Sequence, residues 1–191
     1  EVGKVTKTQS TRQYGLLAAV FGLAATGVYL VMIGVTLDHI QSLSGLRPFD
    51  MRPGGYSSEQ AIALLDALGI EGRRYYLTRQ IPLDLAYPAL MALTLVSILK
   101  LLELQDANRV LTRAGVWLSV GAATADYWEN AGICAMSLSW PEPSTTLIQA
   151  ASVASIAKAI LTTLAVMTVT IGLIFWVHRK MRNWLNPTSP N

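Results

Sequence analysis

The sequence has only one cysteine and lacks the glycine-rich motifs that bind nucleotides. Because Cys134 is alone, the chain can form neither an intrachain disulfide nor a zinc site built from cysteines. No Walker-type loop and no dinucleotide fingerprint occurs, and Gly54-Gly55 is too short a signal to replace them. No cofactor and no metal is therefore predicted, although a bound lipid is compatible with the composition.

Charged residues are also scarce, at 14% of 191 residues, whereas a soluble domain carries about 25%. The formal charge of +3 is too small a bias to indicate a nucleic-acid partner. Hydrophobic residues make up 52% of the chain and gather in four long blocks, which a globular core would not require. The expected partner is the lipid bilayer.

The four blocks predict four membrane-spanning helices, since a helix of about 20 apolar residues crosses the hydrocarbon core. The first block has no charged residue, and the others contain the ionisable residues discussed below. The predicted fold class is an all-α integral membrane protein, a four-helix bundle forming a single membrane domain over residues 1–191. The predicted spans are about 15–37, 81–102, 114–138 and 147–177, with an outer loop at 38–80 and basic tails at 1–14 and 178–191.

Lysine and arginine near the span ends predict the orientation, because positive residues are enriched on the cytoplasmic side. They cluster before the first span, between the second and third, and after the fourth, whereas the loop after the third has none. The loop after the first span has five arginines, but it is long and carries acids too. Both termini are thus predicted on the cytoplasmic, matrix or stromal side of a bacterial inner membrane or an organellar membrane. His39 and His178 then lie at opposite faces and cannot ligate one haem together. His39 alone, next to Asp38, is more typical of an interfacial residue than of an axial ligand.

The loop at 38–80 contains the signals of one short helix. Ser57 and Gln60 have the spacing of a capping box. The apolar residues that follow recur at helical spacing until Gly69 ends the run. We predict an amphipathic helix over about 58–68, on the outer membrane surface or over the mouth of the bundle.

Ionisable residues inside the predicted spans are the most informative feature, because a charge at mid-span costs roughly 2.5–3.5 kcal/mol on insertion scales. At about 1.5 Å of rise per residue from the inner basic flanks, these side chains lie roughly 20–30 Å up. They therefore share one slab in the outer half of the membrane, together with two tyrosines and one amide. The candidate catalytic residues are Asp84, Asp126 and Glu129, and the candidate binding residues are Asn130, Lys158, Arg73, Tyr29 and Tyr87.

Three interpretations of this set stand side by side. The acids and bases can form a buried salt-bridge network that fixes helix register, with Lys158 extending to the outer interface. They can bind or transform a lipophilic molecule, because an unpaired acid in an apolar cavity takes up a proton and can donate it. They can also move protons or ions, although alternating access is difficult for four helices without oligomerisation.

The same residues carry a resemblance. Gly72-Arg73-Arg74-Tyr75-Tyr76 precedes Asp84 and Pro88, and Asp126-Tyr127-Trp128-Glu129-Asn130 precedes Lys158 in a helix rich in serine and alanine. This pattern, over about 53–160, resembles a group of small four-helix bacterial membrane proteins. The resemblance implies that Arg73, Asp84, Asp126, Glu129, Asn130 and Lys158 act as one constellation, and it implies no reaction.

For function, the sequence favours an accessory or structural subunit of a larger membrane complex, with neighbouring membrane subunits as partners and lipid or pigment in its grooves. Small residues on the first predicted span, Gly15, Ala18, Gly22 and Thr26, suit close helix packing. The alternative is a small membrane enzyme or binder acting on a lipophilic substrate, with Asp126 or Glu129 as acid or base. In that alternative Asp84 and Asn130 orient the acid, and Lys158 or Arg73 holds a polar head group.

Overall fold

The computed structural model describes residues 2–185, with side chains from residue 7 onward, and this part of the chain is helical without strands. Two π-helical turns, η1 and η3, join long helices into continuous stretches, and η2 is a single 3-10 turn. The helical segments are α1 (Val2–Val31), η1 (Met32–Thr36), α2 (Leu37–Ser44), η2 (Phe49–Met51), α3 (Ser58–Tyr75), η3 (Tyr76–Gln80), α4 (Ile81–Leu104), α5 (Arg109–Leu138) and α6 (Thr145–Leu185).

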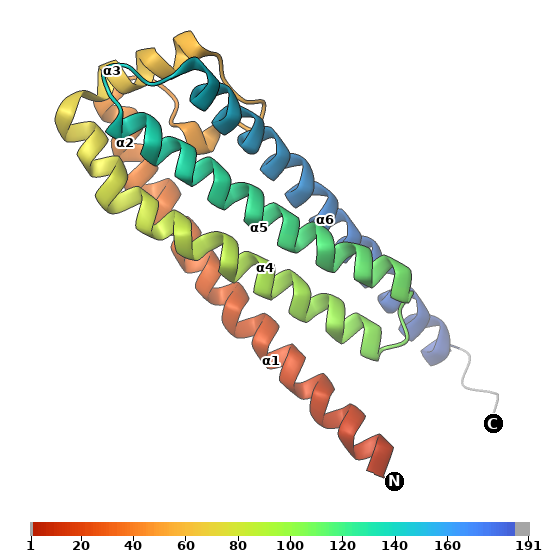
Figure 1. The fold of residues 1–191 in the computed structure, drawn as a ribbon. Helices are drawn as coiled ribbons and strands as arrows, with labels where there is room; N and C mark the ends of the chain where they lie inside the picture. Colours follow the sequence, from red (N-terminus) through yellow and green to blue (C-terminus); the bar gives the residue numbers. More distant parts are fainter. Residues whose placement is uncertain (1, 186–191) are drawn as a thin grey trace.

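The four long helices α1, α4, α5 and α6 lie side by side and alternate in direction (Figure 1). α1 packs on α4, α4 on α5, and α5 on α6. The beginning of α1, the α4–α5 turn and the end of α6 lie together at what we call the basal end (Figure 1). The loop containing η2, together with α2 and α3, covers the opposite end, which we call the cap end.

Each predicted span falls inside a helix that extends beyond it, because hydropathy registers only the apolar part of a helix. Three helical stretches of the described chain are long and apolar enough to cross a membrane, namely 7–44, 58–104 and 145–185. α5, which contains the predicted span 114–138, is not among them. It carries two acids and an amide, Asp126, Glu129 and Asn130, on its inner face.

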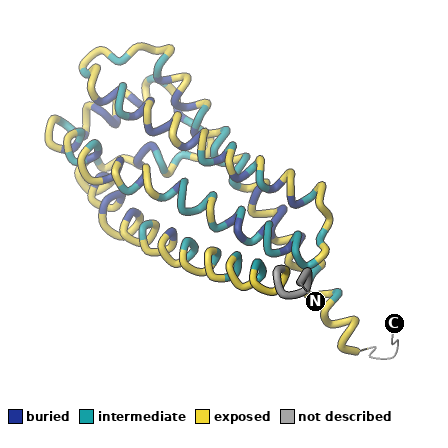
Figure 2. The backbone as a smooth tube through the Cα atoms, turned by 60° about the horizontal axis from the view of Figure 1, so that its bottom comes forward, coloured by how far each residue is buried: buried dark blue, intermediate teal, exposed yellow. Residues whose placement is uncertain are grey.

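The polar face of α5 is buried between α4 and α6. Its buried residues recur along one face from Thr112 to Ser137, toward α4 and α6. In contrast, α1 is exposed along most of its length (Figure 2). The least apolar of the long helices therefore has neighbours on its polar side.

The predicted capping box and the break at Gly69 are both present at the cap end, but the helix there is longer than predicted. The Ser57 hydroxyl accepts from the backbone N–H of Gln60, and the Gln60 side chain accepts from the backbone N–H of Ser57, which completes the capping box. The helix breaks at Gly69, whose φ of 60° suits glycine. It then resumes and runs through η3 into α4, so the chain is helical from Ser58 to Leu104 rather than only over 58–68. Burial explains the extension, because Tyr76 and Gln80 face the interior at 0% exposure.

The helix over 58–68 does lie across the mouth of the bundle. Its buried face packs on the cap ends of α5 and α6 and joins the larger of two hydrophobic cores. That core includes Leu64, Leu65 and Leu68 of α3, with Ile133, Met136 and Ile148 of α5 and α6.

Two glycines permit the close contacts that shape the site. A Cβ at Gly132 would lie 2.5 Å from the Cβ of Ala151, so the absence of a side chain at Gly132 lets α6 approach α5 closely there. A Cβ at Gly55, whose φ is 77°, would lie 2.6 Å from the Ser152 hydroxyl oxygen. The next residue, Tyr56, donates its backbone N–H to that oxygen at 2.8 Å. The η2 loop is thereby anchored to α6.

The predicted basic tails are helical where they are described, as continuations of α1 and α6. Arg179 of α6 donates to the backbone carbonyls of Gln105 and Asp106, at 2.7 Å each, and so holds the α4–α5 turn at the basal end. Residues 186–191 of the C-terminal tail lie outside the described residues.

Candidate functional site

Polar side chains from α4, α5 and α6 meet inside the bundle, on the cap side of its middle. α5 supplies Asp126, Glu129 and Asn130, whose spacing of three and four residues places them on one face. α6 supplies Ser155 and Lys158, again three residues apart, and α4 supplies Asp84. All but Lys158 are at least nine-tenths buried.

Lys158 is the centre of an ion-pair triad that joins α5 to α6. Its Nζ lies 3.2 Å from Oδ1 of Asp126 and also contacts Oε2 of Glu129. The other Glu129 oxygen accepts the Ser155 hydroxyl. Two carboxylates therefore share one ammonium, and Glu129 is held on both oxygens.

Asn130 takes no part in the triad and instead satisfies a backbone carbonyl of α4 that Pro88 leaves without a donor. Pro88 has no N–H, so the carbonyl of Asp84, four residues earlier, loses its helical partner. The Asn130 amide donates to that carbonyl at 2.9 Å. The Asp84–Pro88 and Glu129–Asn130 segments thus meet: Pro88 leaves a buried carbonyl without its helical donor, and the Asn130 amide satisfies it, as buried backbone groups require.

A second polar chain reaches the site from the cap end. The Thr36 hydroxyl in η1 donates to Gln80 in η3, and the Gln80 amide lies 3.5 Å from Oδ1 of Asp50 in η2. The Tyr76 hydroxyl also donates to Asp50. The Asp50 carboxyl in turn is close enough to that of Asp84 to interact with it. The two π-helical turns and the loop therefore bring an additional acid to the site.

Tyr56, in the segment between η2 and α3, lies close enough to Glu129 to interact with its charge. It is 8% exposed and its ring tilts against Phe49. Burial, and next the negative charge of Glu129, raise the pKa of the Tyr56 hydroxyl above its ordinary value. This tyrosine therefore stays neutral and contributes a hydroxyl dipole.

Asp50, Asp84 and Asp126 also border a groove of about 700 Å³, which lies between the α1–η1 stretch and α6. Its walls are mostly apolar, from Met32 and Ile33 on one side and Val166 and Met167 on the other. Its polar floor comes from the η2 loop, α4, α5 and α6. The floor and rim residues are Tyr29, Arg47, Asp50, Asp84, Tyr87, Asp126 and Lys158.

No family model, curated protein or solved structure matches this chain.

The groove divides the predicted site residues into three groups. Asp84, Asp126, Lys158, Tyr29 and Tyr87 line it. Glu129 and Asn130 do not line it, and each is 1% exposed behind the floor.

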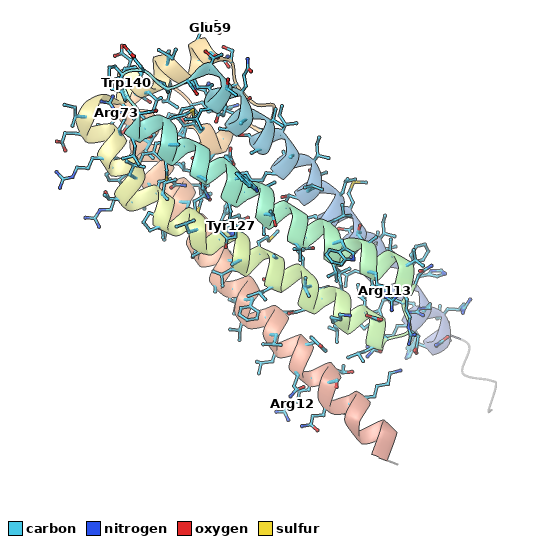
Figure 3. The ribbon with its side chains drawn as sticks, viewed as in Figure 1. Arg12, Glu59, Arg73, Arg113, Tyr127 and Trp140 are labelled. Atoms are coloured by element: carbon cyan, nitrogen blue, oxygen red, sulfur yellow. The ribbon has the colours of Figure 1, made fainter. Side chains whose placement is uncertain are left out.

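Arg73 lies elsewhere. It donates to the Leu65 carbonyl at 2.6 Å, and its guanidinium lies 5.0 Å from the ring centre of Trp140. Figure 3 shows Arg73 and Trp140 together at the cap end, far from Arg12 and Arg113 at the basal end. The resemblance that grouped Arg73 with the acids therefore combines two separate places in the fold.

Asp50, Tyr56, Gln80 and Ser155 are not among the site residues predicted from the sequence, and Tyr76 appears only in the motif that carries the resemblance. Asp50 sits between Arg47-Pro48 and Arg52-Pro53-Gly54-Gly55, a segment with the composition of an ordinary loop. Tyr76 and Gln80 had one available signal, their spacing of four residues with Asp84 further along the same helix.

Chemically, the groove can hold an elongated apolar molecule with a polar end against the floor. Lys158 is already neutralised by two carboxylates, whereas Asp84 has an oxygen, Oδ2, without a hydrogen-bond partner. Such an oxygen can accept a donor from a bound molecule.

Proposed function

We propose that this chain is an integral membrane protein of four spans that binds a lipophilic molecule in the groove between α1 and α6. Three stretches are apolar enough to cross unaided, and α5, whose polar face turns toward its neighbours, completes the bundle. The positive-inside rule assigns the basal end, where both termini lie, to the cytoplasmic, matrix or stromal side.

The observation that carries the binding role is the groove itself. Apolar walls that end on buried ionisable groups match an amphiphile, because the chain gains from burial and the head group finds hydrogen-bond partners. A groove between two outer helices can be entered sideways from the bilayer. A chemical step on the bound molecule would fall to Asp84 or Asp126, because Glu129 does not reach the groove.

The test compares two neighbouring substitutions on α6. Ala159 lines the groove, whereas Ile160 is 54% exposed and does not line it. Ala159→Trp should fill the groove and Ile160→Trp should not. Native mass spectrometry of the chain purified in mild detergent should show a retained lipophile in the wild type and in Ile160→Trp, and its loss in Ala159→Trp. Equal retention in all three proteins would refute binding in this groove.

The second candidate function is an accessory subunit of a larger membrane complex, favoured by the outer face of the α1–η1 stretch. A Cβ at Gly27 or Gly34 would meet nothing within 4 Å, and the apolar stretch of this helix is only 11% buried. Small residues on a free face let another helix approach closely. Gentle extraction from native membranes should then yield a particle larger than one chain. A stable, lone monomer would remove this candidate and leave the binding role in place.

A further inference from the structure

The charges around the groove do not balance. Asp126 and Glu129 share Lys158, so this ammonium is already outnumbered. Among the residues that the structure describes, no lysine or arginine forms an ion pair with Asp50 or Asp84. Two further carboxyl groups therefore border the groove without a base of their own.

Asp84 is the less satisfied of the two. Its side chain is 2% exposed, it lines the groove, and its Oδ2 has no hydrogen-bond partner. Asp50 differs, because Tyr76 and Gln80 both donate to it. Two neighbouring carboxylates away from water repel each other and carry a large desolvation cost, which a cation beside Asp84 or a proton on it would remove.

Two aromatic rings stand at the same groove. Tyr29 of α1 and Tyr87 of α4 stack with 5.7 Å between ring centres, and both line the groove beside Asp84. Aromatic faces attract cations and repel anions. The Tyr29–Tyr87 pair and Asp84 therefore both favour a positively charged group on the bound molecule.

We infer that the molecule bound in this groove is an amine-bearing lipophile, with its ammonium between Asp84 and the Tyr29–Tyr87 pair and its apolar chain along α6. This inference rests on the proposed binding function and adds the chemical class of the ligand. Arg47 also lines the groove, but it is exposed at the rim. An anionic head group would face Asp84 and Asp50, and its pairing partners would be the shared Lys158 and, at the rim, Arg47.

The experiment uses the full chain in nanodiscs of neutral lipid and three probes of equal chain length. These are dodecylammonium, dodecanoate and the uncharged dodecanol. Each is titrated while the thermal unfolding midpoint is measured, since a ligand that binds the folded state raises that midpoint. Ala159→Trp in the same nanodiscs corrects for effects of each probe on the bilayer. Dodecylammonium should bind at least about tenfold more tightly than dodecanoate, and dodecanol should lie between them.

Two substitutions test the residues named. Asp84→Asn should abolish the preference for the ammonium, whereas Asp66→Asn, which removes the same charge at an exposed position of α3, should retain it. Tyr29→Leu covers the case in which Asp84→Asn does not fold, because Tyr29 is 45% exposed and its loss leaves the interior unchanged. Tyr29→Leu should weaken ammonium binding several-fold and leave dodecanol binding unaltered.

The outcomes separate this inference from the function on which it rests. Equal binding of the three probes, or tighter binding of dodecanoate, would overturn the amine class while the lipophile-binding groove stands. A preference for ammonium that survives in both Asp84→Asn and Tyr29→Leu would also overturn it. Absence of binding for every probe, with wild type and Ala159→Trp alike, would overturn the groove and the inference together.

Discussion

At the scale of single residues, the buried polar groups of this protein separate into those that hold helices together and those that face the groove. Glu129 and Asn130 belong to the first kind, because each satisfies a partner on another helix and neither lines the groove. Asp84 and Asp126 belong to the second. The division assigns different consequences to substitutions that look alike in the sequence.

The pairing of Asn130 with the carbonyl freed by Pro88 predicts a rescue. Asn130→Leu should lower the free energy of unfolding by about 1–3 kcal/mol, because it leaves a buried carbonyl without a donor. Adding Pro88→Ala should restore part of the loss, since alanine supplies the N–H that the carbonyl of Asp84 lacks. Unfolding midpoints in mild detergent would measure both steps. A double variant that is less stable than Asn130→Leu would show that the carbonyl is not the reason.

The triad around Lys158 predicts strong coupling between its members. Lys158→Met should destabilise by roughly 3–5 kcal/mol, because it leaves two buried carboxylates without their cation. Glu129→Gln should cost less, because Lys158 keeps Asp126 as its partner. The double variant should lose clearly less than the sum, as residues in one ion-pair network do. Additive losses measured by thermal unfolding would contradict the triad. With function assayed as retained lipophile, Glu129→Gln should act only through stability.

At the scale of helices, the glycines of α5 distinguish tight from loose contacts with α6. Gly132→Ala should cost about 1–3 kcal/mol, because its methyl group would overlap the Cβ of Ala151 at 2.5 Å. Gly121→Ala is the matched control, since its methyl group would meet only a Leu161 side chain at an ordinary 3.5 Å. The two variants should therefore unfold at clearly different temperatures. Equal midpoints would indicate that α5 and α6 are further apart at Gly132.

Periodicity predicted the helices and their polar faces, but it could not predict the groove. The three-to-four spacing along α5 follows from the sequence alone, as does the break at Gly69. Which helices become neighbours is set by tertiary packing, so the opening between α1 and α6 has no local signal. Asp50 shows the same limit. Its place depends on Gly55 and Tyr56 docking on Ser152 of α6, a contact between residues far apart in the chain.

At the scale of the whole molecule, the distribution of polar groups bears on how the chain sits in a bilayer. The polar site lies between two hydrophobic cores, a large one at the cap end and a smaller one around Leu95, Leu99, Ala165 and Val169. Arg12 and Arg113 lie at the basal end (Figure 3), and Arg179 of α6 holds the α4–α5 turn there. The proposal of four spans therefore places the groove on the side away from the termini.

Cysteine labelling tests that arrangement, because Cys134 is the only thiol and Cys134→Ser provides a background without one. Single cysteines would replace exposed residues at the basal end, Gln9 and Asn183, and at the cap end, Gly54 and Glu142. In intact cells, a membrane-impermeant maleimide should label the two cap-end positions and leave the two basal positions unlabelled until the membrane is opened.

Three spans instead of four would put positions 9 and 183 on opposite sides, since an odd number of crossings separates the ends of the chain. Protection of position 142 with labelling of position 54 would specifically remove α5 from the membrane. Labelling of 54 and 142 together, with 9 and 183 protected, means that α4 and α5 cross together or not at all. Because the stretch 58–104 that contains α4 is apolar enough to cross, both helices would then cross, and α5 can do so despite its acids only when neighbouring helices pair those acids.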